Sequence, residues 1–186
     1  MKYLTTSLRM LLFMTLLTGI AYPLFVTAIS QLFFSNKANG SLIEKNGILI
    51  GSELIGQNFE LDRYFWPRPS AVGFNPLPSG GSNLGQASTD LKKTVEERRL
   101  KNQHANPGLR AVPQDLLFAS GSGLDPHISV EAAEYQIVRV AKARSMETTA
   151  VRKLLSELTE GRQWGTLGEP RVNVLKLNLA MDALAK

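Results

Sequence analysis

The sequence predicts an α+β protein with a single N-terminal transmembrane helix, followed by a mixed, helix-rich extracytoplasmic domain with short strands. Three observations lead to this prediction. The run from residue 10 to residue 34 carries no charge, and all 16 acidic residues lie after it. Short β-type segments bounded by glycines follow, and the second half contains amphipathic stretches with helix-capping residues.

The predicted membrane span is the run 10–34, MLLFMTLLTGIAYPLFVTAISQLFF. As an α-helix these residues reach about 37 Å, which exceeds a hydrocarbon core of ~30 Å. Pro23 is expected to kink the helix, because the carbonyl of Gly19 loses its donor, and a hydroxyl such as that of Thr18 could compensate. The alternative is a signal peptide cleaved after GIA (19–21), but the apolar run continues well beyond that site, which favours a retained span.

The ends of the span suggest a topology. Lys2 and Arg9 precede the span and Lys37 and Lys45 follow it, so the number of basic residues near its two ends is equal. A short basic N-terminus normally stays on the cytoplasmic side, and long domains are translocated largely regardless of charge. We therefore expect residues 1–9 in the cytoplasm, residues 10–34 in the membrane, and residues 37–186 as an extracytoplasmic accessory domain.

The elements of this domain follow from local patterns. The segment 40–59 predicts short strands, the segment 67–85 is too rich in proline and glycine for a regular element, and a turn is expected at 106–108. The expected strands are Ile48 to Ile50 and Leu54 to Ile55. A charged helix is expected from Ser88 to about Gln103, and a short one from Pro113. A well-capped helix is expected between Ser129 and Arg144. A last helix, which Gly161 stops, is expected to have Val151, Leu154, Leu155 and Leu158 on one face. The C-terminus predicts a strand that passes into a helix near Asn178.

Composition excludes several classes of protein. The chain has no cysteine, so it has no disulfide scaffold, thiolate metal site or cysteine nucleophile. A net charge of +5 invites a nucleic-acid interpretation. However, the basic residues are interleaved with acids, as in the segment 91–103, and no nucleic-acid motif accompanies them, so we expect no nucleic-acid partner.

The stretch SGSGLDPHIS (120–129) contains serine, histidine and aspartate and so suggests a hydrolase. The nucleophile elbow requires Gly-x-Ser-x-Gly, but here the glycines flank Ser122 directly. We interpret the stretch as a turn followed by the Ser129 helix cap, and we expect no catalytic residue and no metal site.

The segment PSGGSN (78–83) raises the possibility of an anion-binding nest of backbone N–H groups at Ser79, Gly80 and Gly81. On its own such a segment is more often a plain turn. Three arginines could supply counter-charge to an anion or simply pair with glutamates of the same domain: Arg68, Arg139 and Arg144 on one side, Glu131, Glu134 and Glu160 on the other.

Taken together, these segments resemble a known family. The N-terminal span, followed in order by RPSA (68–71), NPLPSGGSNLG (75–85), SGSGLDPHIS, QIVRVAKAR (136–144) and VNVLKLNLAMD (172–182), is similar to the C subunit of the Kdp potassium-transporting ATPase. The resemblance covers essentially the whole chain. One departure is Val138, where the family usually has proline before the arginine.

The resemblance implies an accessory, non-catalytic subunit that crosses the bacterial inner membrane once. Its implied partners are a channel-like subunit that carries potassium and a P-type subunit that hydrolyses ATP, together with the lipid bilayer. The family is described as a catalytic chaperone that raises the ATP affinity of the pump subunit. The resemblance implies no cofactor of its own, but ATP contacted together with the pump subunit, with Gln136 as the nucleotide-binding residue. This implication conflicts with the topology expected above, because ATP is cytoplasmic and residues 37–186 are expected outside. The alternatives are a membrane-anchored extracytoplasmic enzyme and a secreted binding protein released by signal cleavage.

Within this picture the segment 67–85 becomes a candidate docking loop for the potassium-carrying subunit. Trp66 and Phe74 are the expected anchors, because large aromatic side chains dominate interface energetics, and Arg68 could add a charge-assisted contact. The alternative is that both aromatic side chains fill the core of their own domain.

Overall fold

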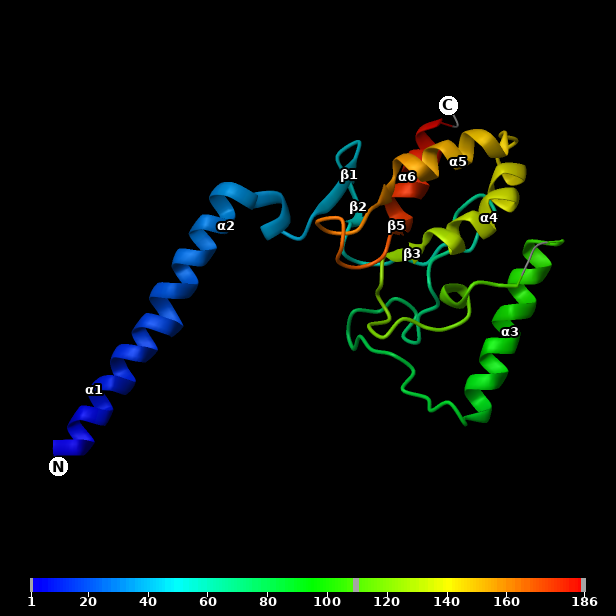
Figure 1. Ribbon diagram of the computed structural model, residues 1–186. Helices are drawn as coiled ribbons and strands as arrows, with labels where there is room; N and C mark the ends of the chain where they lie inside the picture. Colours follow the sequence, from blue (N-terminus) through cyan, green and yellow to red (C-terminus); the bar gives the residue numbers. More distant parts are fainter. Residues whose placement is uncertain (1, 109–110, 185–186) are drawn as a thin grey trace. The chain divides into compact units, whose positions relative to one another are not determined.

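The computed structural model describes residues 2–108 and 111–184, in two compact units of which the first ends at Ile50 and the second begins at Gly51. The first unit contains the N-terminal helix and the second contains most of the helices and strands (Figure 1). The chain is α+β with one N-terminal apolar helix, as predicted.

The N-terminal helical segment extends from Lys2 to Ala38 and is long and apolar enough to cross a membrane, with a mean hydropathy of 1.9 over its most apolar stretch. It consists of α1 (Lys2–Leu16), a π-helical turn (Leu17–Ala21) and α2 (Tyr22–Ala38).

The π-helical turn lies immediately before Pro23, so the helix passes the missing N–H by a local change of hydrogen-bond register. The expected compensation by Thr18 is wrong, because its hydroxyl donates to the carbonyl of Met14 at 2.7 Å rather than to Gly19. Non-helical backbone occurs further along, at Phe34.

A hairpin of β1 (Leu42–Lys45) and β2 (Ile48–Ser52) follows, as predicted for residues 48–50. Asn46 and Gly47 both have positive φ, which matches the two-residue turn that hairpins favour. The second expected strand, Leu54 to Ile55, is wrong. The N–H of Leu54 donates to the Ser52 hydroxyl oxygen and that of Ile55 to the Ser52 carbonyl, so these residues form a turn.

The second unit is built on helices and a small antiparallel sheet. The strand order is β3-β5-β4, with His127 paired to Asn173 and Thr159 paired to Val172. The elements are α3 (Thr89–Ala105), the 3-10 turn η2 (Gln114–Leu116), β3 (His127–Ser129), α4 (Val130–Ala143), α5 (Thr148–Glu157), β4 (Thr159–Glu160), β5 (Arg171–Asn173) and α6 (Val174–Leu184). The core that these elements enclose includes the fully buried side chains of Phe65, Ile128, Ile137, Leu155, Leu177 and Met181.

Helix α4 confirms its predicted cap. The Ser129 hydroxyl oxygen accepts from the N–H of Ala132 at 3.2 Å, and eight residues of the helix are buried. Val138, at the position where the resemblance leads one to expect proline, is half exposed and the helix runs through it without interruption. In α5, Val151 and Leu155 are buried as expected, but the helix ends at Glu157, before Gly161.

The C-terminal helix begins earlier than predicted. The strand β5 ends at Asn173 and α6 starts at Val174, not near Asn178. The physical reason is a cap: the Asn173 side-chain oxygen accepts from the N–H of Lys176 at 3.1 Å. From Val174 onward, the apolar pattern that suggested a strand is therefore the buried face of a helix.

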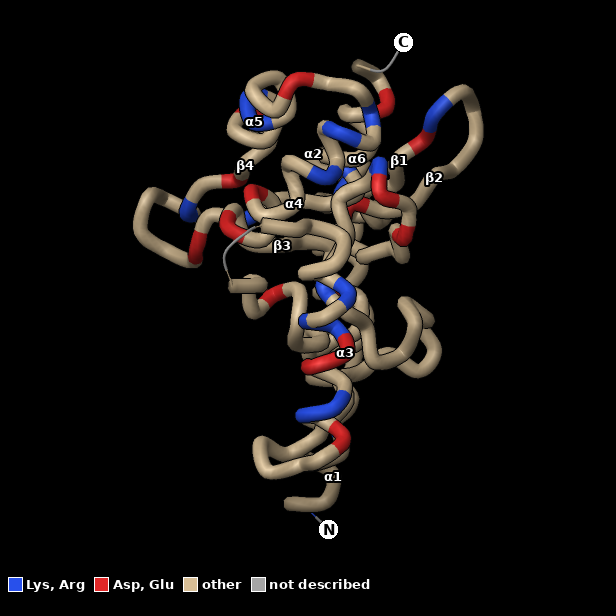
Figure 2. Tube along the Cα trace, turned by 90° about the vertical axis from the view of Figure 1, so that its right-hand side faces the viewer, with Lys and Arg blue, Asp and Glu red and all other residues tan. Residues whose placement is uncertain are grey.

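Helix α3 confirms the predicted charged helix, and the Ser88 hydroxyl oxygen caps it by accepting from the N–H of Leu91. Basic and acidic residues are interspersed along this helix (Figure 2). The helix that was expected at Pro113 is only the single turn η2. The segment 67–85 has no helix or strand, as predicted, and the turn at 106–108 is present.

Candidate functional site

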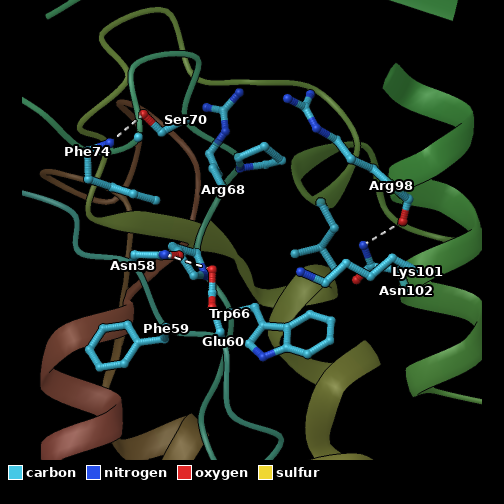
Figure 3. A pocket seen from close by; sticks show the side chains of 14 residues that line it. Asn58, Phe59, Glu60, Trp66, Arg68, Ser70, Phe74, Arg98, Lys101 and Asn102 are labelled. Atoms are coloured by element: carbon cyan, nitrogen blue, oxygen red, sulfur yellow. Dashed lines mark hydrogen bonds between the residues drawn. The ribbon is translucent and has the colours of Figure 1, made fainter. Parts of the chain in front are cut away.

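The three residues predicted as docking anchors line one pocket. Trp66, Arg68 and Phe74 lie together around a cavity of about 290 Å³, which we call the α3 pocket. Arg98 and Lys101 of α3 line its other side (Figure 3). The pocket therefore combines aromatic and cationic side chains from two segments that are distant in sequence.

Hydrogen bonds within the loop hold the Phe74 side of the pocket. The Ser70 hydroxyl oxygen accepts from the N–H of Val72 at 3.2 Å and from that of Phe74 at 2.9 Å. Phe74 has a φ of 61°, a left-handed conformation that is costly for an aromatic residue and persists only where surrounding contacts impose it. Its side chain is half-buried, so Phe74 is neither a core residue nor a free anchor.

Trp66 forms the apolar floor of the pocket. The Arg139 guanidinium lies 4.0 Å from the indole centroid and the Lys101 ammonium 5.0 Å from it. The indole N–H donates to the carbonyl of Leu61 at 3.3 Å. Trp66 is only 9% exposed, so its own domain already covers most of its surface, and the docking role predicted for it can involve only a small remaining area.

Arg68 already has partners within the domain. Its guanidinium lies 3.1 Å from Asp125 and 4.0 Å from Asp115. Burial alone would raise the pKa of Asp125, but hydrogen bonds from His127 and the charge and hydrogen bond of Arg68 outweigh it and lower that pKa. Arg68 therefore ties the loop to the segment 115–125 and retains little free charge for a partner.

Arg139 and Arg144 also act within the domain. Arg139 is buried and donates to the carbonyls of Asp62 and Tyr64 at 2.6 and 3.0 Å. Burial lowers the pKa of Arg139 to about 10, although the nearby Asp62 carboxylate opposes this. Arg144 pairs with Asp182 at 2.7 Å.

The glutamates expected as partners of these arginines lie elsewhere. Glu134 pairs with Arg152 at 3.2 Å, and Glu160 pairs with Arg171 at 3.0 Å. The expected pairing of the three arginines with Glu131, Glu134 and Glu160 is therefore wrong. Aspartates and backbone carbonyls hold these arginines instead.

Gln136, the nucleotide-binding candidate, is fully buried and its amide has four hydrogen bonds to protein groups. The side-chain oxygen accepts from the backbone N–H of Trp66 and from Arg139, both at 2.7 Å. The side-chain nitrogen donates to the carbonyls of Trp66 at 3.2 Å and Ala132 at 3.1 Å. Gln136 thus fixes the backbone of Trp66, which forms the floor of the α3 pocket.

The nest candidate Ser79, Gly80 and Gly81 packs against the SGSG stretch. A Cβ on Gly81 would lie 3.2 Å from the carbonyl oxygen of Gly121, and a Cβ on Gly123 would lie 2.7 Å from that of Gly80. Glycine at positions 81 and 123 therefore permits the two backbones to approach closely. This packing accounts for Gly81 and Gly123, whereas a Cβ on Gly80 would meet no described atom within 4 Å, so the anion nest stays a prediction.

The SGSGLDPHIS stretch behaves as a turn and a cap. The Ser122 hydroxyl oxygen accepts from the N–H of Leu124, and an Asp125 carboxylate oxygen accepts from the N–H of His127. The His127 ring lies 3.7 Å from Asp125 and 3.8 Å from Glu160. Residues 127–129 also form β3, a strand that the sequence did not predict.

Sequence reasoning missed the α3 side of the pocket, namely Arg98 and Lys101. Arg98 donates to the carbonyl of Leu117 at 2.8 Å, and Lys101 lies over the Trp66 ring. Their spacing of three residues puts them on one face of α3, which is the only signal that the sequence carries for them.

Comparison with known proteins identifies the family. The model of the family KdpC, "K+-transporting ATPase, c chain", matches residues 4–183. The potassium-transporting ATPase KdpC subunit of Methylococcus capsulatus is 55% identical over 182 residues, 96% of each chain. That of Serratia proteamaculans is 51% identical over 188 residues, 99% of this chain and all of its own. That of Geobacter metallireducens is 51% identical over 191 residues and the full length of both chains.

The order of the sequence motifs, the apolar N-terminal helix and these matches along the whole chain agree with one another. The chain belongs to the KdpC family, the c chains of K+-transporting ATPases.

Proposed function

We propose that this chain is the accessory subunit of a potassium-transporting ATPase, anchored in the bilayer by its N-terminal helix. The observation that carries the proposal is the match of the family model over residues 4–183, which includes both the apolar helix and the following domain. The implied partners are a channel-like subunit that carries potassium and a P-type subunit that hydrolyses ATP. The α3 pocket, with its loop 67–85, is the surface that we assign to docking.

We further propose that the chain is non-catalytic and has no cofactor of its own. Ser122 and His127, the residues that suggested a hydrolase, each serve a local turn, and no hydrogen bond joins them in the described part of the chain. Gln136 could contact ATP only if its buried side-chain amide gave up its hydrogen bonds to the N–H and carbonyl of Trp66. We therefore place the ATP site in the hydrolysing subunit, and any effect on ATP affinity would pass through contacts between subunits.

The proposed location is the bacterial inner membrane, with a single pass. The basic residues Lys2 and Arg9 support a cytoplasmic N-terminus, and the length of the domain after the helix is compatible with translocation. On this view the second unit lies on the extracytoplasmic side.

The first prediction concerns assembly. We expect the tagged chain, purified from membranes of cells that express the complete transporter, to carry two further subunits and potassium-stimulated ATP hydrolysis. The same transporter without this chain should lose most of that activity, because an accessory subunit that holds the complex together cannot be replaced by its partners. A chain that purifies alone from fully expressing cells would contradict the proposed function.

The second prediction concerns topology. Protease added to intact spheroplasts should remove a C-terminal tag, because we place the second unit outside the cytoplasm. A cytoplasmic marker protein in the same sample should stay intact, and inverted membrane vesicles should give the opposite pattern. A tag that is protected in spheroplasts and cleaved in inverted vesicles would place the domain in the cytoplasm.

A further inference from the structure

Two cations of the α3 pocket, Arg98 and Lys101, form no direct ion pair with a residue that the structure describes. The adjacent Arg99, in contrast, pairs with Glu96. Arg98 uses one guanidinium nitrogen to hold the Leu117 carbonyl, and Lys101 is exposed above the indole of Trp66. Both side chains extend from α3 toward the pocket (Figure 3).

The surroundings of these cations favour an anionic ligand. Burial lowers the pKa of Arg98, and the charge of Glu97 offsets only part of this effect. A cation that has lost part of its hydration gains more from a new negative partner than a fully solvated one. Trp66 and Phe74 also limit water on one side of the pocket, which strengthens such a contact.

One further polar atom in the pocket wall, the side-chain oxygen of Asn102, lacks a hydrogen-bond donor among the described residues. Asn102 is only 5% exposed, and its side-chain nitrogen donates to the Arg98 carbonyl. A ligand with an N–H group supplies the donor that the Asn102 oxygen lacks.

We propose that the α3 pocket binds an acidic peptide segment of a partner subunit, with a carboxylate between Arg98 and Lys101. A peptide carries the carboxylate that the two cations need and also the N–H donors that the Asn102 oxygen needs. This inference rests on the proposed function, because it names the chemistry of the partner at the surface assigned to docking.

A free phosphate-type anion fits the same pocket less well. The exposed carboxylate of Glu60, which bonds to Asn58, also lines it and would repel a ligand with several negative charges. The pocket is bordered by exposed residues, so it encloses too little of a small ligand to hold it alone, whereas the rest of an interface would hold a partner side chain in place.

The test is zero-length carbodiimide cross-linking of the purified complex, which joins a lysine amine to a carboxylate only where the two are in contact. We expect mass spectrometry to find Lys101 joined to an Asp or Glu of another subunit, about tenfold more than Lys93, an exposed lysine of the same helix outside the pocket. The adduct should disappear in Lys101→Arg, which keeps the charge but cannot form the amide. Lys101→Glu should also reduce retention of the chain by its partners about tenfold at ~0.3 M NaCl, whereas Lys93→Glu should not.

The outcomes separate the two proposals. An intact complex with no Lys101 adduct and equal retention of Lys101→Glu and Lys93→Glu overturns the acidic-peptide inference and leaves the proposed function in place. A Lys101 adduct formed only with lipid headgroups, or protection of Lys101 by inorganic phosphate or ATP in the chain without its partners, also overturns it. A chain that never co-purifies with other subunits overturns the proposed function itself.

Discussion

Gln136→Leu is expected to lower the free energy of unfolding by about 3–5 kcal/mol. Leucine has a similar size but no polar atoms, so the N–H and carbonyl of Trp66 and one guanidinium nitrogen of Arg139 lose their buried partner. Each buried polar group left unpaired costs about 1–3 kcal/mol, and more for a charged group. Chemical denaturation of the full chain in detergent, followed by tryptophan fluorescence, measures the change.

A surface control separates this effect from a loss of glutamine in general. Gln103→Leu on the exposed side of α3 should change the free energy of unfolding by less than ~0.5 kcal/mol. The nucleotide-binding hypothesis for Gln136 makes a different prediction: the variant would fold with normal stability, and the assembled transporter would need more ATP for half-maximal activity. That combination would show that Gln136 acts on the nucleotide and not on the floor of the α3 pocket.

Local signals were sufficient for the long helices. The Ser88 and Ser129 caps and the amphipathic pattern after Ser129 predicted α3 and α4, because capping and side-chain periodicity act within a few residues. Asn173 is a capping residue of the same type, since its side chain caps α6, although the sequence analysis placed the start of that helix near Asn178.

Of the small sheet the sequence predicted only the C-terminal strand, which is β5 and ends at Asn173. Strands β3 and β5 have three residues each, and their pairing joins His127 to Asn173 across the sequence. Strands as short as β3 and β4 have too little pattern to be identified from the sequence, and each pairs with β5 from a segment that is distant along the chain. The turn interpretation of SGSGLDPHIS was therefore right for its hydrogen bonds and incomplete for its last three residues.

The α3 pocket could also be predicted from the sequence only in part. Composition of the loop pointed to Trp66, Arg68 and Phe74, and all three line the pocket. The partners of each side chain could not be predicted, since Arg68 pairs with Asp125 from a segment 57 residues away. Apart from the three-residue spacing of Arg98 and Lys101, the sequence of α3 does not distinguish Lys101 from Lys93, because the difference arises only when the helix lies beside Trp66.

Gly123 lies where the two motif-bearing loops pack closely together. It has a φ of 71°, and a Cβ there would lie 2.6 Å from a methyl group of Val72 and 2.7 Å from the carbonyl oxygen of Gly80. An alanine must therefore adopt a left-handed conformation and also separate the loops. The same loops place Ser70 and Phe74 at the pocket, so the separation would reach the proposed docking surface.

Gly123→Ala is accordingly expected to lower the free energy of unfolding by about 3 kcal/mol, from ~1–2 kcal/mol of backbone strain and ~1–3 kcal/mol of overpacking. Gly168→Ala is the matched control, since Gly168 has a φ of 77° but a Cβ there would meet no atom of the described residues within 4 Å. Gly168→Ala should lower the free energy of unfolding only by the backbone strain, about 1 kcal/mol, in the same denaturation experiment. Equal losses in the two variants would mean that the loops yield freely at Gly123. In that case the close approach at Gly123 would not be what holds the loop, and its shape would depend on its other contacts, the Ser70 hydrogen bonds and the Arg68–Asp125 ion pair.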